Sequence, residues 1–444
     1  MQIPVPTFEK QRNRMQTRDL IRVYGRVCQV VGIVIESSGP SARVGDLCKI
    51  YAEGIDKDTQ PIYAEVVGFR GNRVLLMPFG ETMGVKVGSH VLNTNTCHRV
   101  PTGVSLLGRV LDGLGMPIDG KGQLSVEEYY PVQNAPPNAL DRKVIHKPLS
   151  LGVKAIDSLM TCGVGQRIGI FSGSGVGKST LLGMIAREAK ADVNVIALVG
   201  ERGREVREFI ENDLGEDGLK RSVIIVATSE QPPLVRIKSA FSATAIAESF
   251  RDKGLNVLLM MDSITRFAMA QREVGLAIGE PPTTKGYTPS VFALLPRLME
   301  RAGNSDKGSI TALYTVLVEG DDTNEPVSDT ARSILDGHIV LTRKLANMSH
   351  YPPIDPMQSL SRVMGLIVPE DQVTAANKFR ELFSAYQEIE DLVSIGAYKP
   401  GSKPIADQAI QKWPQITSFL KQHKNEHGAP FEETVSRLKE IVNA

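Results

Sequence analysis

The chain has 444 residues, of which 51 are Lys or Arg and 50 are Asp or Glu, so its formal net charge is +1. This balance excludes a global electrostatic field that would draw the chain to nucleic acid or to a membrane surface. The length predicts two to three domains of about 150 residues each, and no apolar run approaches the roughly 20 residues that span a bilayer.

Cysteine and histidine placement gives no sign of disulfides or of a metal held by these residues. The four cysteines lack CxxC spacing, which indicates buried free thiols in a reducing cytosol. The seven histidines lack HExxH and other metal-ligand spacings. Because the N-terminus also lacks the apolar core of a signal peptide, we expect a cytoplasmic chain.

Residues 1–20 are polar and mixed in charge, a pattern typical of a mobile arm exposed to solvent. Four basic side chains lie in this segment: Lys10, Arg12, Arg14 and Arg18. Two interpretations stay open for the arm, a solvated tail and a segment that docks a partner.

Residues 21–98 contain short β-branched runs separated by Gly, Pro, Asn and Asp. The runs are 25–36, 47–51, 62–69 and 73–78. This spacing predicts a small all-β barrel or sandwich. No cluster of chemistry-bearing residues falls within it, so we expect a structural or assembly role.

Residues 99–371 alternate between strand-like and helix-like segments after a Pro-rich connector at 133–148. Near-continuous apolar strands are expected at 167–171, 193–199, 222–227, 256–261, 309–319 and 338–342, with helices such as 180–189 and 240–253 between them. This alternation predicts an α/β core with a mostly parallel sheet covered on both faces.

Residues 372–444 change to a helical pattern and predict a small C-terminal helical domain. The expected helices are 375–395, 405–424 and 431–442. Gly396 is expected to end the first helix, and Pro414 to kink or split the second.

A phosphate-binding loop lies between the strand at 167–171 and the helix that follows it. It comprises Ser174, Gly175, Val176, Gly177, Lys178, Ser179 and Thr180. Glycines let the backbone wrap round phosphate oxygens, and the following helix adds its positive end. We expect Lys178 to reach the β- and γ-phosphates and Ser179 to bind Mg²⁺. The pattern departs from its strict form at Ser172, where the strict form has Gly.

A carboxylate follows the apolar strand at 256–261. Asp262 therefore falls at the carboxyl edge of the expected sheet, where ligands collect in open α/β folds. Such an Asp can hold Mg²⁺, directly or through water, opposite Ser179. Taken alone it is a common capping residue, but downstream of a phosphate loop it indicates a metal-nucleotide site.

Charged residues follow the strand at 193–199, in the stretch Gly200-Glu201-Arg202-Gly203. Glu201 is expected beside the γ-phosphate, where a carboxylate can orient and polarise an attacking water. Arg202 can contact phosphate oxygens through its fork of donors. The alternative for this stretch is a charged loop with surface ion pairs, and it remains the better interpretation for Arg204, Glu205 and Arg207.

Long stretches of the chain resemble the catalytic subunits of rotary-type ATPases, close to the F-type β subunit. The stretches are SGSGVGKST, GERGREVREF, VLLMMDSITRFAMAQREVG, GEPPTTKGYTPSVFALLPRLMERAG, KGSITALYTVLVEGDDTNEPVSD, ILDGHIVLTRKLA, HYPPIDPMQSLSRVM and EIEDLVSIGAY. Between about residues 20 and 420, the sequence is most similar to the ATPases of type III protein export, and among them to the flagellar export ATPases.

The resemblance implies an N-terminal β-barrel, a RecA-like P-loop core and a C-terminal helical domain, assembled as homohexameric rings that hydrolyse Mg-ATP to power export. It identifies Glu201 as the catalytic carboxylate, Arg202 as the γ-phosphate arginine and Tyr351 as the aromatic that stacks on adenine. It also identifies Arg362 as the arginine that reaches a neighbouring subunit's site, so the implied catalytic set is Lys178, Glu201, Arg202 and Arg362.

The same resemblance implies partners: a stator-like regulator at the N-terminal arm, a central-stalk-like coiled-coil protein, and the export gate with its chaperones and substrates. The chain would be peripheral to the inner membrane through this apparatus and would bind no nucleic acid. One departure from the F-type β subunit concerns the adenine pocket. Phe419-Leu420 is followed by Lys421-Gln422-His423-Lys424, so the second aromatic wall has no equivalent in this sequence.

Three alternatives accompany this interpretation. A virulence-type III secretion ATPase shares nearly all of these motifs and stays open. A non-catalytic nucleotide-binding ring subunit would lack the carboxylate, so Glu201 favours an enzyme. A RecA-like RNA translocase needs a basic channel or a barrel with stacking aromatics, which a near-neutral chain with 5% aromatic residues disfavours.

Overall fold

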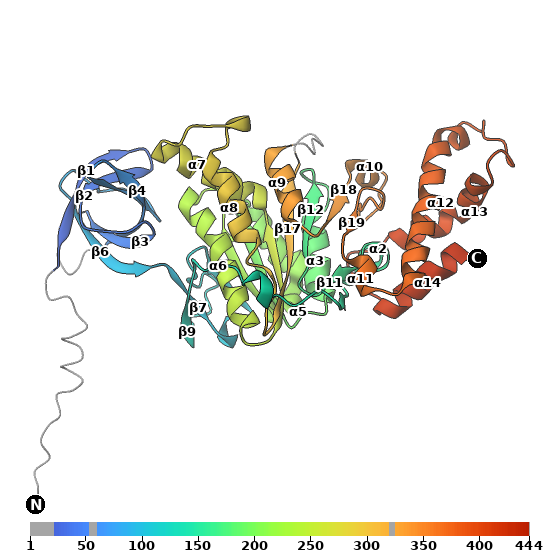
Figure 1. Ribbon diagram of the computed structural model, residues 1–444, viewed down its shortest axis with the longest axis horizontal. Helices are drawn as coiled ribbons and strands as arrows, with labels where there is room; N and C mark the ends of the chain where they lie inside the picture. The colour runs from blue at the N-terminus through green and yellow to red at the C-terminus, as the bar shows by residue number, and fades with distance from the viewer. Residues whose placement is uncertain (1–21, 53–59, 319–324, 444) are drawn as a thin grey trace, which may run out of the picture. The chain divides into compact units, whose positions relative to one another are not determined.

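The computed structural model describes residues 22–52, 60–318 and 325–443 (Figure 1). The chain divides into two compact units, Met1–His98 and Arg99–Ala444. The arm expected at residues 1–20 lies outside the described residues. Across the described ranges, no helix combines the length and the apolar character that a membrane span requires.

Six strands of the first unit close into a barrel in the order β1-β2-β5-β4-β3-β6. They are β1 (Tyr24–Val31), β2 (Val34–Ser38), β3 (Asp46–Tyr51), β4 (Ile62–Arg70), β5 (Arg73–Pro78) and β6 (His90–Cys97). The run expected at 25–36 is two strands, because Gly32 adopts a φ of 57° and turns the chain between them. Inward-facing Val27, Ile35 and Val66 belong to a buried core that fills the barrel. The structure confirms the barrel and excludes the sandwich.

A large sheet forms the centre of the second unit, with strand order β19-β18-β12-β17-β15-β13-β14-β8. Its strands are β8 (Arg109–Asp112), β12 (Arg167–Ser172), β13 (Val193–Val199), β14 (Ser222–Ala227), β15 (Asn256–Asp262), β17 (Ser309–Leu317), β18 (Gly337–Leu341) and β19 (Leu360–Ser361). All neighbouring pairs from β18 to β8 are parallel. The expected parallel sheet is confirmed, although residue 319, the last of one expected strand, lies outside the described residues.

Short strands outside this path complete the β-structure: β7 (Arg99–Thr102) with β9 (Glu128–Pro131), β10 (Pro148–Leu149) with β11 (Cys162–Gly163), and β16 (Gly303–Asn304) beside β17. Helices cover both faces of the large sheet, which explains why every residue of β13 and β14 is buried. Figure 1 shows α6 and α8 in front of the sheet and α3 and α5 behind it. These helices and their neighbours are α2 (Lys154–Leu159), α3 (Lys178–Glu188), α4 (Gly203–Glu208), α5 (Gly215–Lys220), α6 (Pro233–Arg251), α7 (Ile264–Ile278), α8 (Pro289–Met299), α9 (Pro326–Ile334), α10 (Arg343–Asn347) and α11 (Met364–Ile367).

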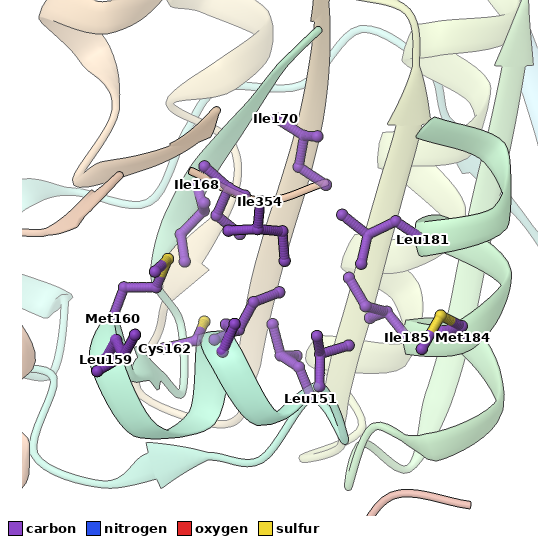
Figure 2. Packing of buried hydrophobic residues seen from close by; sticks show 14 of the residues in the cluster. Leu151, Leu159, Met160, Cys162, Ile168, Ile170, Leu181, Met184, Ile185 and Ile354 are labelled. Atoms are coloured by element: carbon purple, nitrogen blue, oxygen red, sulfur yellow. The ribbon is translucent and has the colours of Figure 1, made fainter. Parts of the chain in front are cut away.

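The core beneath α3 fixes the helix against the sheet. Figure 2 shows Ile168 and Ile170 from β12 and Leu181 and Ile185 from α3 pointing into the same space. All four side chains are buried, and burial of each such side chain contributes roughly 1.5–3 kcal/mol. The loop between β12 and α3 is therefore held at both ends by packed apolar residues.

Three helices follow the sheet: α12 (Glu370–Ser394), α13 (Pro404–Leu420) and α14 (Phe431–Asn443). They lie side by side (Figure 1), and the ring of Tyr386 on α12 stacks 3.7 Å from that of Trp413 on α13. Gly396, with a φ of 70°, lies just beyond the end of α12 as expected. Of the two expectations for Pro414, the split is wrong, since α13 continues through Pro414 as one helix, and the kink stays a prediction.

Candidate functional site

The loop between β12 and α3 adopts a backbone that only glycine accepts easily. Gly175 has a φ of 74° and Gly177 a φ of 107°, both in the left-handed region. Lys178 begins α3 directly after Gly177, so the free amides of the first helical turn face the loop. Ser172, which replaces the expected glycine, is the buried last residue of β12 and is not among the residues that line the adjoining cavity.

Sheet order explains why three charged side chains meet at this loop. Strand β17 lies between β12 and β15, so the carboxyl end of β15 is one strand away from the loop, and β13 is the next strand beyond it. Lys178 Nζ donates to Asp262 Oδ1 and lies 3.6 Å from Glu201 Oε1. Thr315 on β17 donates its hydroxyl to Asp262 Oδ1 at 2.8 Å. The lysine therefore bridges the two carboxylates that end the neighbouring strands.

Burial makes the protonation of this cluster unusual. Desolvation raises the pKa of Glu201 to about 7, with the Asp262 charge acting in the same direction and Lys178 opposing it. Burial of the Lys178 ammonium disfavours its charge, but Asp262 and Glu201 outweigh that effect and leave the pKa of Lys178 raised. Glu201 Oε1 is buried without a hydrogen-bond partner in the described structure. Such an oxygen is available to a water or a ligand.

A polar cavity of about 320 Å³ opens over this cluster. Its lining includes the predicted residues Ser174, Gly175, Gly177, Lys178, Ser179, Thr180, Glu201 and Arg202. The predicted Val176 is buried in the core beneath the loop instead. Arg202 is the least constrained of the set, since its side chain is 75% exposed and its Nη1 lies 3.7 Å from Glu205 Oε1.

Sequence reasoning missed several residues of the polar cavity. Arg266, in the first turn of α7, lies with its Nε 4.0 Å from Glu201 Oε1. Its signal was its position four residues after Asp262, because the first turn of a helix that follows a strand stays at the same sheet edge. Glu205, Glu208 and Asp213 also line the cavity. Burial raises the pKa of Asp213, against the nearby Lys424 and Arg187 and a hydrogen bond from Thr180.

An apolar cavity of about 280 Å³ adjoins the polar cavity, and Gly177 and Thr180 line both. Its remaining lining is Leu181, Met184, Tyr351, Pro352, Pro353, Gln422, His423 and Lys424. Tyr351 is half-exposed there, and its ring lies close to Gly177. The second wall, for which no aromatic was found in the sequence, is made by residues 422–424.

Arg362 lies apart from both cavities within one chain. Its side chain is exposed, and its backbone N–H donates to the carbonyl of Asp336 at 2.9 Å. The carboxylate of Asp355 accepts hydrogen bonds from Met357 and Gln358. No ion pair between Arg362 and Asp355 occurs in the described part of the chain.

The residues at the polar cavity fit a divalent cation that arrives with phosphate. Ser179 lines the cavity, whereas Asp262 is buried, bonded to Lys178 and not among the lining residues. The two offer a hydroxyl and a carboxylate, the hard oxygen ligands that Mg²⁺ prefers. Over the described ranges, no group of three or more His, Cys, Asp or Glu is placed to hold a metal ion. A Mg²⁺ here would thus take its other ligands from phosphate oxygens and water, which is the usual arrangement in phosphoryl-transfer sites.

Comparison with known proteins matches most of the chain to known domain families. Residues 152–361 match the nucleotide-binding domain of the ATP synthase alpha/beta family, and residues 27–95 match the β-barrel domain of that family. Residues 368–440 match the T3SS EscN ATPase C-terminal domain. A flagellum-specific ATP synthase of Bacillus subtilis is 57% identical over 430 residues, which cover 96% of this chain and 97% of that protein.

The chain belongs to the ATP synthase alpha/beta family. Within the family it is similar to export-related members of two kinds. A type 3 secretion system ATPase of Xanthomonas euvesicatoria is 50% identical over 95% of each chain. The assembled ATPase EscN of the enteropathogenic E. coli type III secretion system covers 94% of this chain with a TM-score of 0.88 and 46% identity. A second structure holds EscN in complex with its central stalk EscO, with a TM-score of 0.86 and 45% identity over 94% of this chain.

Proposed function

We propose that this chain hydrolyses Mg-ATP in a homohexameric ring and that the hydrolysis energises flagellar protein export. The observation that carries the proposal is the junction of a polar and an apolar cavity at Gly177 and Thr180. A nucleoside triphosphate has the same division, with a charged chain at one end and a flat base at the other. The polar cavity also holds the buried Glu201 Oε1, which accepts no hydrogen bond in the described structure and is therefore open to a nucleophilic water.

Binding falls to the loop and to Tyr351. The loop residues Ser174 to Thr180 offer backbone amides to phosphate oxygens, and Lys178 offers a charge to the β- and γ-phosphates. Tyr351 stacks its ring on the base in the apolar cavity. Lys178 lies between Asp262 and Glu201. When phosphate binds, its oxygens replace these carboxylates as the anionic partners of the Lys178 ammonium.

Ser179 and Asp262 would hold the metal, Asp262 directly or through water. A bound Mg²⁺ would supply positive charge against the charge that develops on the phosphate. The Thr315 hydroxyl donates a hydrogen bond to Asp262 Oδ1. This bond keeps Asp262 in place even when Lys178 contacts phosphate instead.

Hydrolysis depends on Glu201. Its carboxylate orients the attacking water and accepts its proton, for which a pKa near the working pH is well suited. Arg202 and Arg266 line the same cavity and contact phosphate oxygens with their guanidinium groups. A non-catalytic ring subunit would not need Glu201, and the near-neutral charge of the chain gives no support to an RNA translocase.

Arg362 acts on the site of a neighbouring subunit. Its exposed and unpaired guanidinium supports this assignment, since it has no partner among the described residues of its own chain. An arginine supplied from outside stabilises charge on the transferring phosphoryl group. The similarity to an assembled EscN supports the ring that such an arrangement needs.

The export role follows from the relatives, which are flagellum-specific and type 3 secretion proteins. We assign a barrel to residues 21–98, the nucleotide domain to 99–371 and the helical domain to 372–444. A central-stalk-like coiled-coil protein, a stator-like regulator at the arm of residues 1–20, and the export gate with its chaperones and substrates complete the proposal. The chain is then cytoplasmic and peripheral to the inner membrane. Virulence-type secretion is the second candidate, favoured by the EscN similarity.

The variant Glu201→Gln tests the catalytic assignment. It keeps the shape of the side chain but removes the charge that accepts a proton, so hydrolysis should fall by roughly 10²–10⁴ while Mg-ATP still binds. Steady-state ATPase assays and calorimetric titration with ATP measure the two quantities. If binding and hydrolysis fall together, Glu201 is structural and another carboxylate acts.

A further inference from the structure

Residues 421–428 belong to the connector between α13 and α14, which spans 421–430, and supply one wall of the apolar cavity through Gln422, His423 and Lys424. A second wall is the segment 351–353, and Gly177 with the first turns of α3 supplies the rest of the lining. A connector that is not a helix or a strand needs an anchor if it is to hold a flat ligand against Tyr351.

Gln422 has the contacts of such an anchor. It is only 3% exposed, and its side chain bonds backbone groups of a third segment: Oε1 accepts from Lys154 N at 3.0 Å, and Nε2 donates to Gly152 O at 2.9 Å. Its own backbone N–H donates to Tyr351 O at 2.9 Å. Gln422 therefore connects the two walls of the cavity to each other and links them to residues 152–154 at the start of α2.

The rest of the connector is fixed to the start of α2 and to the end of α3. Lys154 forms an ion pair with Glu426 at 2.5 Å. Glu188, the last residue of α3, lies 3.1 Å from His427 Nδ1 and accepts from Gly428 N at 3.2 Å. Gly428 packs directly on Gly152, where an added Cβ would lie 2.8 Å from Gly152 Cα.

We propose that Gln422 is the positioning residue for the nucleotide base, since it sets the spacing between the Tyr351 wall and the connector. The inference rests on the proposed ATP site. Gln422 turns its side chain away from the ligand toward Gly152 and Lys154, so it acts on the base only through the walls. The phosphate end has anchors of its own in the loop and does not depend on Gln422.

The test compares a ligand with a base and a ligand without one. Mg-ATP and Mg-tripolyphosphate are titrated into the full chain, into Gln422→Ala, and into Gln422→Met, which keeps the length of the side chain but makes no amide hydrogen bonds. Gln411→Ala, an exposed site on α13, is the matched control. Both Gln422 variants should weaken ATP binding and raise its KM by about tenfold, the size expected for lost buried hydrogen bonds, and leave tripolyphosphate affinity and kcat within about twofold of the parent.

Unchanged ATP affinity in Gln422→Met, or an equal loss for ATP and tripolyphosphate, overturns the inference. Failure of the parent chain to bind either ligand overturns the proposed function instead. Hydrogen exchange on the parent chain gives a measurement that needs no variant: ATP should slow exchange at the amides of 421–428, and tripolyphosphate should not. Equal protection by both ligands would contradict a base-specific role.

Discussion

The polar and apolar cavities share Gly177 and Thr180, yet they are built from different kinds of sequence. The polar cavity takes most of its lining from two short stretches, 173–180 with the loop and the first residues of α3, and 201–208 with the turn after β13 and α4. The apolar cavity takes its lining from three segments that lie far apart along the chain, two of which are joined by the hydrogen bond from Gln422 N to Tyr351 O. Chemistry on phosphate needs charges at fixed spacing, which a local motif supplies, whereas a base needs two flat walls, which tertiary packing supplies.

The largest effect is expected at the polar cavity. Lys178→Ala removes the ammonium that contacts both Asp262 and Glu201, and it should lower ATP and tripolyphosphate affinity alike by about 10²-fold and abolish turnover. Circular dichroism should show an intact fold, because the packed core beneath α3 does not include this side chain. Normal turnover in a folded variant would remove the assignment of the loop.

A large effect is also expected for Arg362, which would act from one subunit on the phosphate end of the nucleotide in the next subunit's site. Arg362→Ala should lower kcat by roughly 10³–10⁵, as for arginines supplied in trans to other NTPases, with little change in nucleotide affinity. Mixing Arg362→Ala subunits with Glu201→Gln subunits should restore part of the activity, because some interfaces then hold both intact residues. Rings shown to be mixed but still inactive would place Arg362 in its own subunit's site.

A smaller and base-specific effect is expected at the apolar cavity. Tyr351→Ala should weaken ATP binding by about tenfold, the contribution of one base–aromatic stack. Tripolyphosphate binding should be unchanged. Tyr351→Phe keeps the ring and serves as the control. Competition titrations measure both ligands, and equal losses for the two would mean that Tyr351 supports the neighbouring loop at Gly177 instead of a base.

The smallest effect concerns pH. Since burial raises the pKa of Glu201 to about 7, the free enzyme holds this base protonated below that pH and ionised above it. The value of kcat/KM should therefore rise up to about tenfold per pH unit below pH 7 and level off above it. Glu201→Gln should lack the inflection. A profile of the parent chain that stays flat from pH 6 to 8 would contradict the role of Glu201 as base.

The comparison also explains what the sequence could predict. The loop, Asp262 and Glu201 follow apolar strands directly, so their place at one sheet edge could be read from the strand pattern. Arg266 carries a weaker signal because it lies inside a helix, and Gln422 carries none, since its partners at Gly152 and Tyr351 are backbone groups. Pro414 was expected to kink or split its helix, and the split does not occur, because packing of α13 next to the proline, such as Trp413 against Phe383, favours a continuous helix.

Because Gln422 anchors the connector through backbone atoms, the positions it contacts should differ in which substitutions they tolerate. Gln422 contacts the amide of Lys154 and the carbonyls of Gly152 and Tyr351, so replacement of a side chain at 154 leaves that hydrogen bond in place. Gly152 is different, because it has a φ of 74° and a Cβ added there would lie 2.3 Å from Glu188 Cβ, which excludes a side chain. Substitutions should thus act differently within a few residues: at 154 they remove the ion pair with Glu426 but keep the backbone hydrogen bond to Gln422, whereas at 152 almost no side chain should be tolerated.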